Sequence, residues 1–210
     1  IQVGSGSNAI ANASLFFSGS DRTSILTMTE TETIIANEDK YSVSFFIKPL
    51  NVARVGGPQM IYNWGGSSNG LTGFITSSKI ITNFYESNRG SVTSASIAND
   101  TMYHVVTTYN GGEAKIYLNS QLIQTSTTGN VGSINGFTGD FDIGGDAKDG
   151  EFYLSSGSAP VSFNDSFNLG ICAYEGFLDE LRVYQNKVLS QNEVTALFLN
   201  PQANTSNVVY

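Results

Sequence analysis

The sequence contains few charged residues and single copies of the side chains most often used in catalysis. Asp, Glu, Lys and Arg make up only 13% of its 210 residues, about half the usual share. Cys172 and His104 are the only cysteine and histidine. The chain can therefore form no intramolecular disulfide. Cys172 lies in an apolar run, and we interpret it as a small core residue rather than a nucleophile.

Two further absences exclude classes of partner. The net charge is −8 and the pI is near 4.5, and no basic stripe is present, so we expect no nucleic acid partner. No hydrophobic run is long enough to span a bilayer, so we expect no membrane insertion. An acidic surface is typical of secreted or virion proteins, and it also simply favours solubility.

The residues that are abundant favour β-structure. Apolar residues make up 40% of the chain, enough for a substantial core, and Ser, Thr, Asn and Gly supply turns and edges. Residues 41–48 alternate most clearly, and Pro49 ends that strand. Asn110-Gly111-Gly112 is a hairpin signal. We count about a dozen short strands without βαβ spacing, which predicts an all-β, two-sheet antiparallel jelly-roll sandwich.

One helix is expected, near the C-terminus. Ser190-Gln191-Asn192-Glu193 has the spacing of a capping box, with Ser190 as the N-cap, and Asn200-Pro201 ends the helix. We expect residues 1–13 to form a linker or docking arm, residues 14–200 the jelly-roll domain, and residues 201–210 a tail.

The stretch Phe177–Tyr184 alternates, and it places a carboxylate among apolar residues. In a strand, the side chains of its odd-numbered residues would lie on one face; these residues are Phe177, Asp179, Leu181 and Val183. This pattern predicts that Asp179 points inward, where a carboxylate needs a cation, a partner charge or several donors. Backbone N–H groups, Arg182 or Arg22 could satisfy it.

Five blocks of the sequence, in order, resemble LamG-like domains of the concanavalin A-like lectin/glucanase group. They are residues 16–21, 41–49, 103–119, 143–145 and 176–194. The resemblance implies the jelly-roll sandwich with one short C-terminal helix. It does not imply an activity, because this fold serves lectins, glycanases, lyases, adhesion modules and virion parts.

The resemblance also implies a structural calcium ion. Asp179 would supply a carboxylate, and backbone carbonyls around Gly19 would complete the oxygen ligands that calcium takes. The alternative is that Asp179 only accepts hydrogen bonds or pairs with an arginine. The acidic residues in 140–151 do not have EF-hand spacing, and a solvated loop is favoured there over a second calcium site.

No catalytic motif is found. Laminarinase-type relatives of this fold carry their two catalytic carboxylates on one strand as Glu-x-Asp-x-(x)-Glu, and the sequence has no such run. A lyase of the alginate type needs a histidine among other groups, but His104 lies in a strand where a packing role is favoured. We therefore predict that the chain is not an enzyme.

A candidate ligand platform combines aromatic rings with amides, as sugar sites do. Its members are Tyr62, Asn63, Trp64, Tyr85 and Asn88. The alternative is that Trp64 caps the core.

The sequence thus predicts a non-catalytic glycan-binding or adhesion module of an extracellular or virion surface protein, stabilised by calcium. The alternative is a structural or interaction domain that decorates a virion or surface assembly without a sugar ligand. Expected partners are a glycan or neighbouring surface or virion protein chains.

Overall fold

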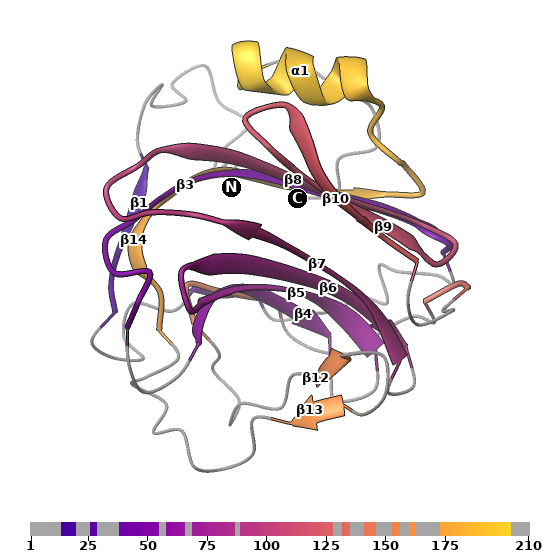
Figure 1. Ribbon diagram of the computed structural model, residues 1–210, viewed down its shortest axis with the longest axis horizontal. Coiled ribbons are helices and arrows are strands. Elements are labelled where there is room, and N and C mark those ends of the chain that lie inside the picture. The colour runs from indigo at the N-terminus through magenta and orange to yellow at the C-terminus, as the bar shows by residue number, and fades with distance from the viewer. Residues whose placement is uncertain are drawn as a thin grey trace.

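The chain folds into two stacked β-sheets with a helix on one outer face (Figure 1). The computed structural model describes residues 14–19, 26–28, 38–54, 58–65, 69–86, 89–127, 132–134, 141–145, 153–155, 160–162 and 173–202. The predicted strand at Phe167–Ala173 lies almost entirely outside these residues, and so do Cys172 and most of the acidic loop.

Sheet A has six antiparallel strands in the order β1-β14-β3-β8-β9-β10. Their bounds are β1 Leu15–Ser18, β3 Lys40–Pro49, β8 Tyr103–Asn110, β9 Glu113–Leu118, β10 Gln121–Ser126 and β14 Glu175–Gln185. The predicted strand at 41–48 is confirmed as β3, and the hairpin at Asn110-Gly111-Gly112 joins β8 to β9.

Sheet B also has six antiparallel strands, in the order β2-β11-β4-β5-β6-β7. Their bounds are β2 Leu26–Met28, β4 Gln59–Gly65, β5 Asn69–Thr76, β6 Lys79–Glu86, β7 Arg89–Ser96 and β11 Phe141–Ile143. A small pair, β12 Tyr153–Ser155 and β13 Pro160–Ser162, lies on the side of sheet B that faces away from sheet A (Figure 1). The predicted two-sheet jelly roll is confirmed.

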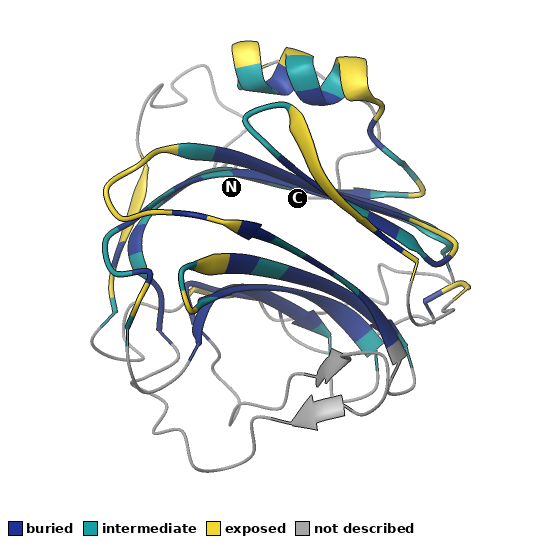
Figure 2. Cartoon of the chain, in the orientation of Figure 1, coloured by how far each residue is buried: buried dark blue, intermediate teal, exposed yellow. Residues whose placement is uncertain are grey.

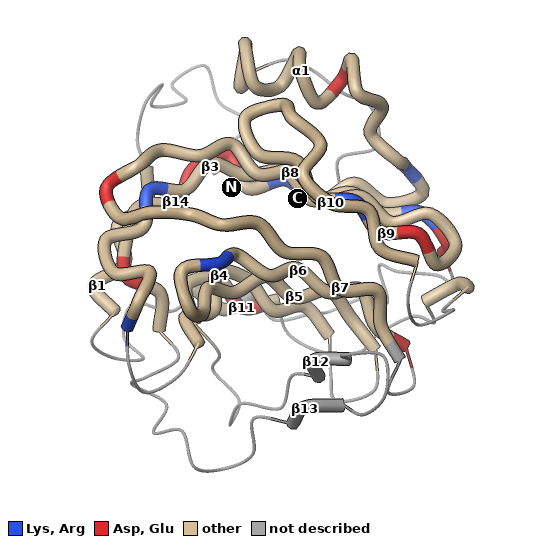
Figure 3. Tube along the Cα trace, in the orientation of Figure 1, with Lys and Arg blue, Asp and Glu red and all other residues tan. Residues whose placement is uncertain are grey.

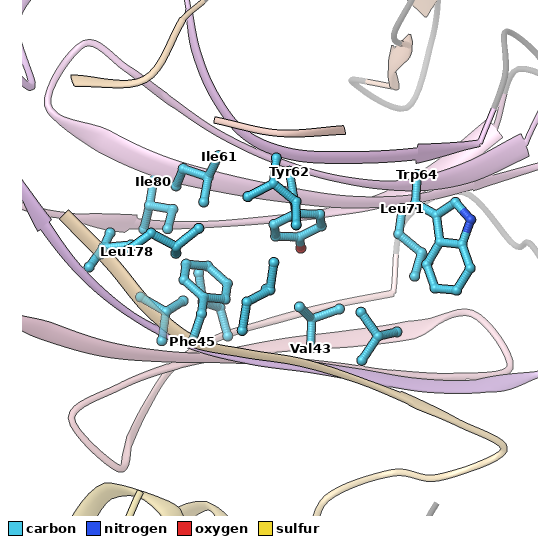
Figure 4. Close-up of a cluster of buried hydrophobic side chains, with 14 of the residues drawn as sticks. Val43, Phe45, Ile61, Tyr62, Trp64, Leu71, Ile80 and Leu178 are labelled. Atoms are coloured by element: carbon cyan, nitrogen blue, oxygen red, sulfur yellow. The ribbon is translucent and has the colours of Figure 1, made fainter. Parts of the chain in front are cut away.

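The main core lies between the sheets because every second side chain of each strand points inward. Val43, Phe45 and Leu178 from sheet A meet Ile61 and Ile80 from sheet B (Figure 4). The central strands of both sheets are accordingly buried along most of their length (Figure 2). Apolar burial of this kind is the dominant favourable term in folding.

Helix α1, Gln191–Leu199, covers part of the outer face of sheet A (Figure 1). A second apolar cluster joins the helix and the segment before it to the sheet; its members are Val106, Tyr117, Tyr184, Leu189, Val194 and Leu197. The predicted capping box is present, since the Ser190 side chain accepts from Glu193 N and the Glu193 side chain accepts from Ser190 N. Lys187 donates to Glu193 as well, and these bonds lower the pKa of Glu193 to about 2.

A β-bulge in β14 reverses the predicted direction of Asp179. Asp179 pairs with Phe46 and Arg182 with Ser44, so two residues of β14 oppose one residue of β3. Glu180 takes the strained left-handed conformation with φ of 51°. Before this extra residue the odd-numbered side chains of β14 point away from the core, and after it they point toward the core. Leu181 and Val183 therefore face the core, while Asp179 lies half-buried on the opposite face. The prediction of an inward-facing Asp179 is therefore wrong.

Candidate functional site

A row of polar side chains crosses the outer face of sheet B. The strand register places Thr27 of β2 opposite Asp142 of β11, Asp142 opposite Asn63 of β4, Asn63 opposite Thr72 of β5, and Thr72 opposite Asn83 of β6. Because directly opposed residues share a face and lie about 5 Å apart, the five form one continuous row. We call these five residues the polar row.

Strand alternation explains why the row points away from the core. The sequence neighbours Trp64, Leu71 and Phe84 belong to the main core, so the residues beside them in β4, β5 and β6 must face outward. Sheet B curves so that its convex side meets sheet A and its concave side carries the polar row and faces β12 and β13 (Figure 1).

Four members of the polar row are buried and Thr27 at its end is exposed; the hydrogen bonds among the described residues do not satisfy every polar atom of the row. Asp142 accepts a hydrogen bond from Thr27 Oγ1 at 2.6 Å. Asn63 and Thr72 are 6% and 0% exposed, yet Asn63 Oδ1 and Thr72 Oγ1 have no hydrogen-bond partner among the residues that the structure describes. Most buried polar atoms in folded proteins are paired, and an unpaired one costs about 1–3 kcal/mol. Two such oxygens lie on opposed residues of neighbouring strands.

The row is bordered by an aromatic ring on one side. Gly70 and Gly90 flank Tyr85 in the register, and a Cβ added to Gly70 would lie 2.7 Å from the Tyr85 hydroxyl oxygen. A Cβ added to Gly90 would meet Asn83 Oδ1 at 2.4 Å. The two glycines thus leave the space that lets Tyr85 and Asn83 lie close to the sheet.

The other border of the polar row is apolar, and the surrounding strands carry little charge. Met60, Phe74 and Ile81 form a small cluster on that side. Strands β4 to β7 carry charged residues only at their ends, as Figure 3 shows. Asp142 is consequently the one formal charge within the polar row.

The structure divides the predicted ligand platform between two faces. Tyr62 and Trp64 point into the core, where Tyr62 meets Phe45 edge-on and Trp64 stacks on Phe141, so neither ring offers a face to solvent (Figure 4). This burial agrees with the alternative interpretation, in which Trp64 caps the core.

The other members of that platform have a different placement. Asn63 and Tyr85 do lie together on the outer face of sheet B, in and beside the polar row. Asn88 lies outside the described residues.

The two predicted calcium ligands do not converge. Ser18 pairs with Glu175 and Leu15 with Leu178, so Gly19 and Asp179 lie beyond opposite ends of this ladder, roughly 16 Å apart along the strands. The Gly19 carbonyl instead accepts from the Arg54 guanidinium at 3.2 Å.

Asp179 has local partners that account for it without a metal. Asp179 Oδ1 accepts from Glu180 N at 2.8 Å, and Arg182 pairs with Glu180 rather than with Asp179. Burial raises the pKa of Asp179, and this backbone hydrogen bond opposes the increase. No cluster of three His, Cys, Asp or Glu residues able to hold a metal occurs within the described ranges. Asp179 and Gly19 therefore do not fit one calcium site.

His104 has the packing role that the sequence suggested. Its ring stacks between Phe46, with centroids 4.5 Å apart, and Phe198 of α1, with centroids 6.0 Å apart. Nε2 is hydrogen-bonded to Ser44 Oγ at 3.0 Å, while Nδ1 is buried and has no partner among the residues whose placement is described. Burial, together with the nearby charge of Arg182, lowers its pKa to about 4. The imidazole is neutral at physiological pH and serves the attachment of α1.

Sequence reasoning missed four of the five members of the polar row: Thr27, Thr72, Asn83 and Asp142. Each is a polar residue at an outward position of an otherwise apolar strand, and this local signal is weak. What unites them is cross-strand register, which depends on a bulge in β4 between Met60 and Tyr62. No single segment of the sequence reveals that register.

Comparisons with known proteins agree with this architecture. Residues 18–195 match the family Laminin_G_3, described as the concanavalin A-like lectin/glucanases superfamily. A search of curated protein sequences found no match. In the part of the chain described here, no helix has the length and apolar character needed to cross a membrane.

Several solved structures share the fold at low sequence identity. The binding domain of botulinum neurotoxin serotype G superposes with a TM-score of 0.65 at 15% identity, over 91% of this chain and 44% of that chain. Another structure of the type G receptor binding domain gives 0.58 at 14% identity, over 87% and 41%. A heptameric SAP-like pentraxin from Limulus polyphemus gives 0.59 at 17% identity, over 87% and 80%. This chain thus spans less than half of the toxin domains.

Proposed function

From the premise that this chain belongs to the concanavalin A-like lectin/glucanases superfamily, we propose that it is a non-catalytic glycan-binding module of an extracellular or surface protein. The observation that carries the proposal is the polar row on sheet B, where Asn63 Oδ1 and Thr72 Oγ1 are buried and have no partner within the described part of the chain. Sugars are recognised by placed polar groups, and the row presents an amide and a hydroxyl on neighbouring strands. The Tyr85 ring that borders the row is 0% exposed and offers no free face.

The composition of the row supports binding rather than cleavage. Glycoside hydrolysis requires two carboxyl groups on either side of the scissile bond, about 5 Å apart in retaining enzymes. Asp142 is the one carboxylate in the row, and its neighbours are an amide and a threonine. Its hydrogen bond from Thr27 also gives it a structural role.

The structural neighbours add support of a weaker kind. Two of them are named as binding or receptor-binding domains, and the third is a pentraxin. At identities of 14–17% these structures support a shared fold only, so function must be argued from the site.

A glycan array with the intact chain tests the proposal. We expect selective binding that is reduced in Asn63→Ala and retained in Lys79→Ala, whose exposed side chain lies at the end of β6. Incubation with the bound polysaccharide should release no reducing ends. Absence of binding to every glycan, or measurable turnover, would contradict the proposal.

A second candidate function is that of an interaction domain in a surface assembly. The observation in its favour is an aromatic pair on the outer face of sheet A, Phe16 and Phe177, with ring centroids 5.1 Å apart. Phe16 is 56% exposed and lies on the edge strand β1, and exposed apolar surface at a sheet edge favours association. Light scattering after size exclusion should show an assembly that Phe16→Ser dissociates; a monomer at all concentrations would count against self-association.

A further inference from the structure

We propose that the guanidinium of Arg54 takes the place of a metal ion where β1 ends, and that this corner of the fold needs no calcium. The residues concerned are Gly19, Asn51, Arg54, Gln59 and Glu175, which we call the rim cluster. The inference concerns the cofactor requirement of the fold, and it does not depend on the proposed glycan binding.

A carboxylate residue lies beside Gly19 at the outer edge of sheet A, where β1 pairs with β14 (Figure 1). Ser18 pairs with Glu175 at the end of this ladder, and a Cβ added to Gly19 would lie 2.7 Å from Glu175 Cβ. Backbone carbonyl and carboxylate oxygens are the ligands that calcium takes. The carboxylate that accompanies the Gly19 carbonyl is therefore that of Glu175, and not that of Asp179.

One turn after β3 supplies a donor to each of these two acceptors. The turn is closed by Arg54 N, which donates to Asn51 O at 3.4 Å. Arg54 Nη1 donates to the Gly19 carbonyl at 3.2 Å, and Asn51 Nδ2 donates to Glu175 Oε2 at 3.4 Å. The oxygens that a calcium ion would bridge are thus already joined by N–H groups of residues three apart in the chain.

Gln59 of β4 fixes this turn against β14. Its side chain is 1% exposed; Nε2 donates to Asn51 O at 2.5 Å, and Oε1 accepts from Glu175 N at 3.0 Å. Leu50 N donates to Glu175 O at 3.0 Å as well. Because buried polar groups are costly to leave unpaired, the turn stays beside β14, and the two donors are held in position before any cation arrives.

The charge of Arg54 opposes a second cation at the same place. A guanidinium stays protonated in proteins, and Arg54 is half-buried, so water screens only part of its repulsion of a calcium ion. Calcium also requires roughly six to eight oxygen ligands, whereas the Gly19 carbonyl and Glu175 Oε2 already accept hydrogen bonds. Arg54 therefore brings the positive charge that a metal ion would otherwise supply.

Arg54→Met tests the role of the guanidinium, because it keeps an unbranched apolar stem and removes the charge and the donors. We expect the melting temperature to fall by roughly 3–10 °C, and Arg54→Lys to lie between the parent and this variant, since it keeps the charge without the planar donors. Lys48→Met is the matched control. Lys48 pairs with Asp100 at 3.5 Å in an ion pair open to solvent, so its loss should change the melting temperature by less than about 2 °C.

Melting the parent and Glu175→Gln in EDTA and in millimolar calcium chloride tests the metal directly. We expect the parent to melt at the same temperature in both. An EDTA effect of equal size in the parent and Glu175→Gln comes from a metal outside the rim cluster and agrees with the inference. An EDTA effect that Glu175→Gln abolishes shows calcium at the rim cluster and overturns it. Equal melting of Arg54→Met and Lys48→Met overturns it too. None of these measurements uses a glycan, so failure of the proposed function is seen separately.

Discussion

Replacing His104 by glutamine should remove most of the acid sensitivity that this residue gives to the folded chain. The ring is 1% exposed and lies between Phe46 and Phe198. Its folded pKa is about 4 against an ordinary value of 6.5. As the pH falls below 6.5, the unfolded chain binds a proton at this site and the folded chain does not, so the free energy of unfolding decreases until the pH reaches the folded pKa.

The magnitude follows from the two pKa values. Each pH unit between 6.5 and about 4 removes up to about 1.4 kcal/mol, so the full loss is roughly 3 kcal/mol. Between pH 7 and 4.5 the difference is about 2 kcal/mol. Carboxylates act as well: the lowered pKa of Glu193 adds to the acid sensitivity, whereas the raised pKa of Asp179 opposes it. Both groups remain in the variant and cancel in the comparison.

Urea unfolding of the parent and His104→Gln at pH 7 and 4.5 measures the effect. Glutamine keeps a group that can bond to Ser44 Oγ but cannot titrate in this range. Since His104 is the only histidine, its imidazole NMR signals report the folded pKa directly. Parent and variant losing equal stability between the two pH values, or an imidazole that titrates near 6.5, would refute the account of a buried neutral ring.

Three further predictions concern other parts of the fold. Ser190→Ala removes the N-cap of α1 and should cost about 1 kcal/mol in urea unfolding, whereas an unchanged midpoint would show that apolar packing alone holds the helix. Asp179→Asn should leave any effect of EDTA on the melting temperature as it is in the parent, because Asp179 and Gly19 do not converge; an EDTA effect present only in the parent would restore Asp179 as a calcium ligand. Gly144→Ala should cost more than about 2 kcal/mol, since its φ is 80° and the new Cβ would lie 1.9 Å from Phe17. In Gly111→Ala the φ is 54° and no atom lies within 4 Å, so the loss should stay near 1 kcal/mol; equal losses in the two alanine variants would contradict the steric argument.

The architecture could be predicted because its signals are local. Alternation in 41–48 marks β3, Asn110-Gly111-Gly112 marks a hairpin, and Ser190 with Glu193 marks the start of α1. Each depends on residues close together in the chain, where propensity and turn chemistry act. The order of the family-like blocks then defined the sandwich.

The candidate site was predicted only in part because its geometry is non-local. Asn63 and Tyr85 were identified, but Trp64 was placed with them although adjacent residues of a strand face opposite ways. The bulge at Glu180 reversed Asp179, and a glutamate with positive φ has no sequence signal comparable to glycine. Thr72 and Asp142 join the site only through pairing across β4.

The place of β14 in sheet A also bears on how the protein reaches its native state. This strand comes late in the chain, yet it lies between β1 and β3 and pairs with both. Until Glu175–Gln185 has left the ribosome, β1 has no neighbour and β3 has one unsatisfied edge. The contacts that close the sheet join residues far apart in sequence, which predicts slow folding. During synthesis the free edge of β3 is therefore exposed to pairing with other molecules until β14 covers it.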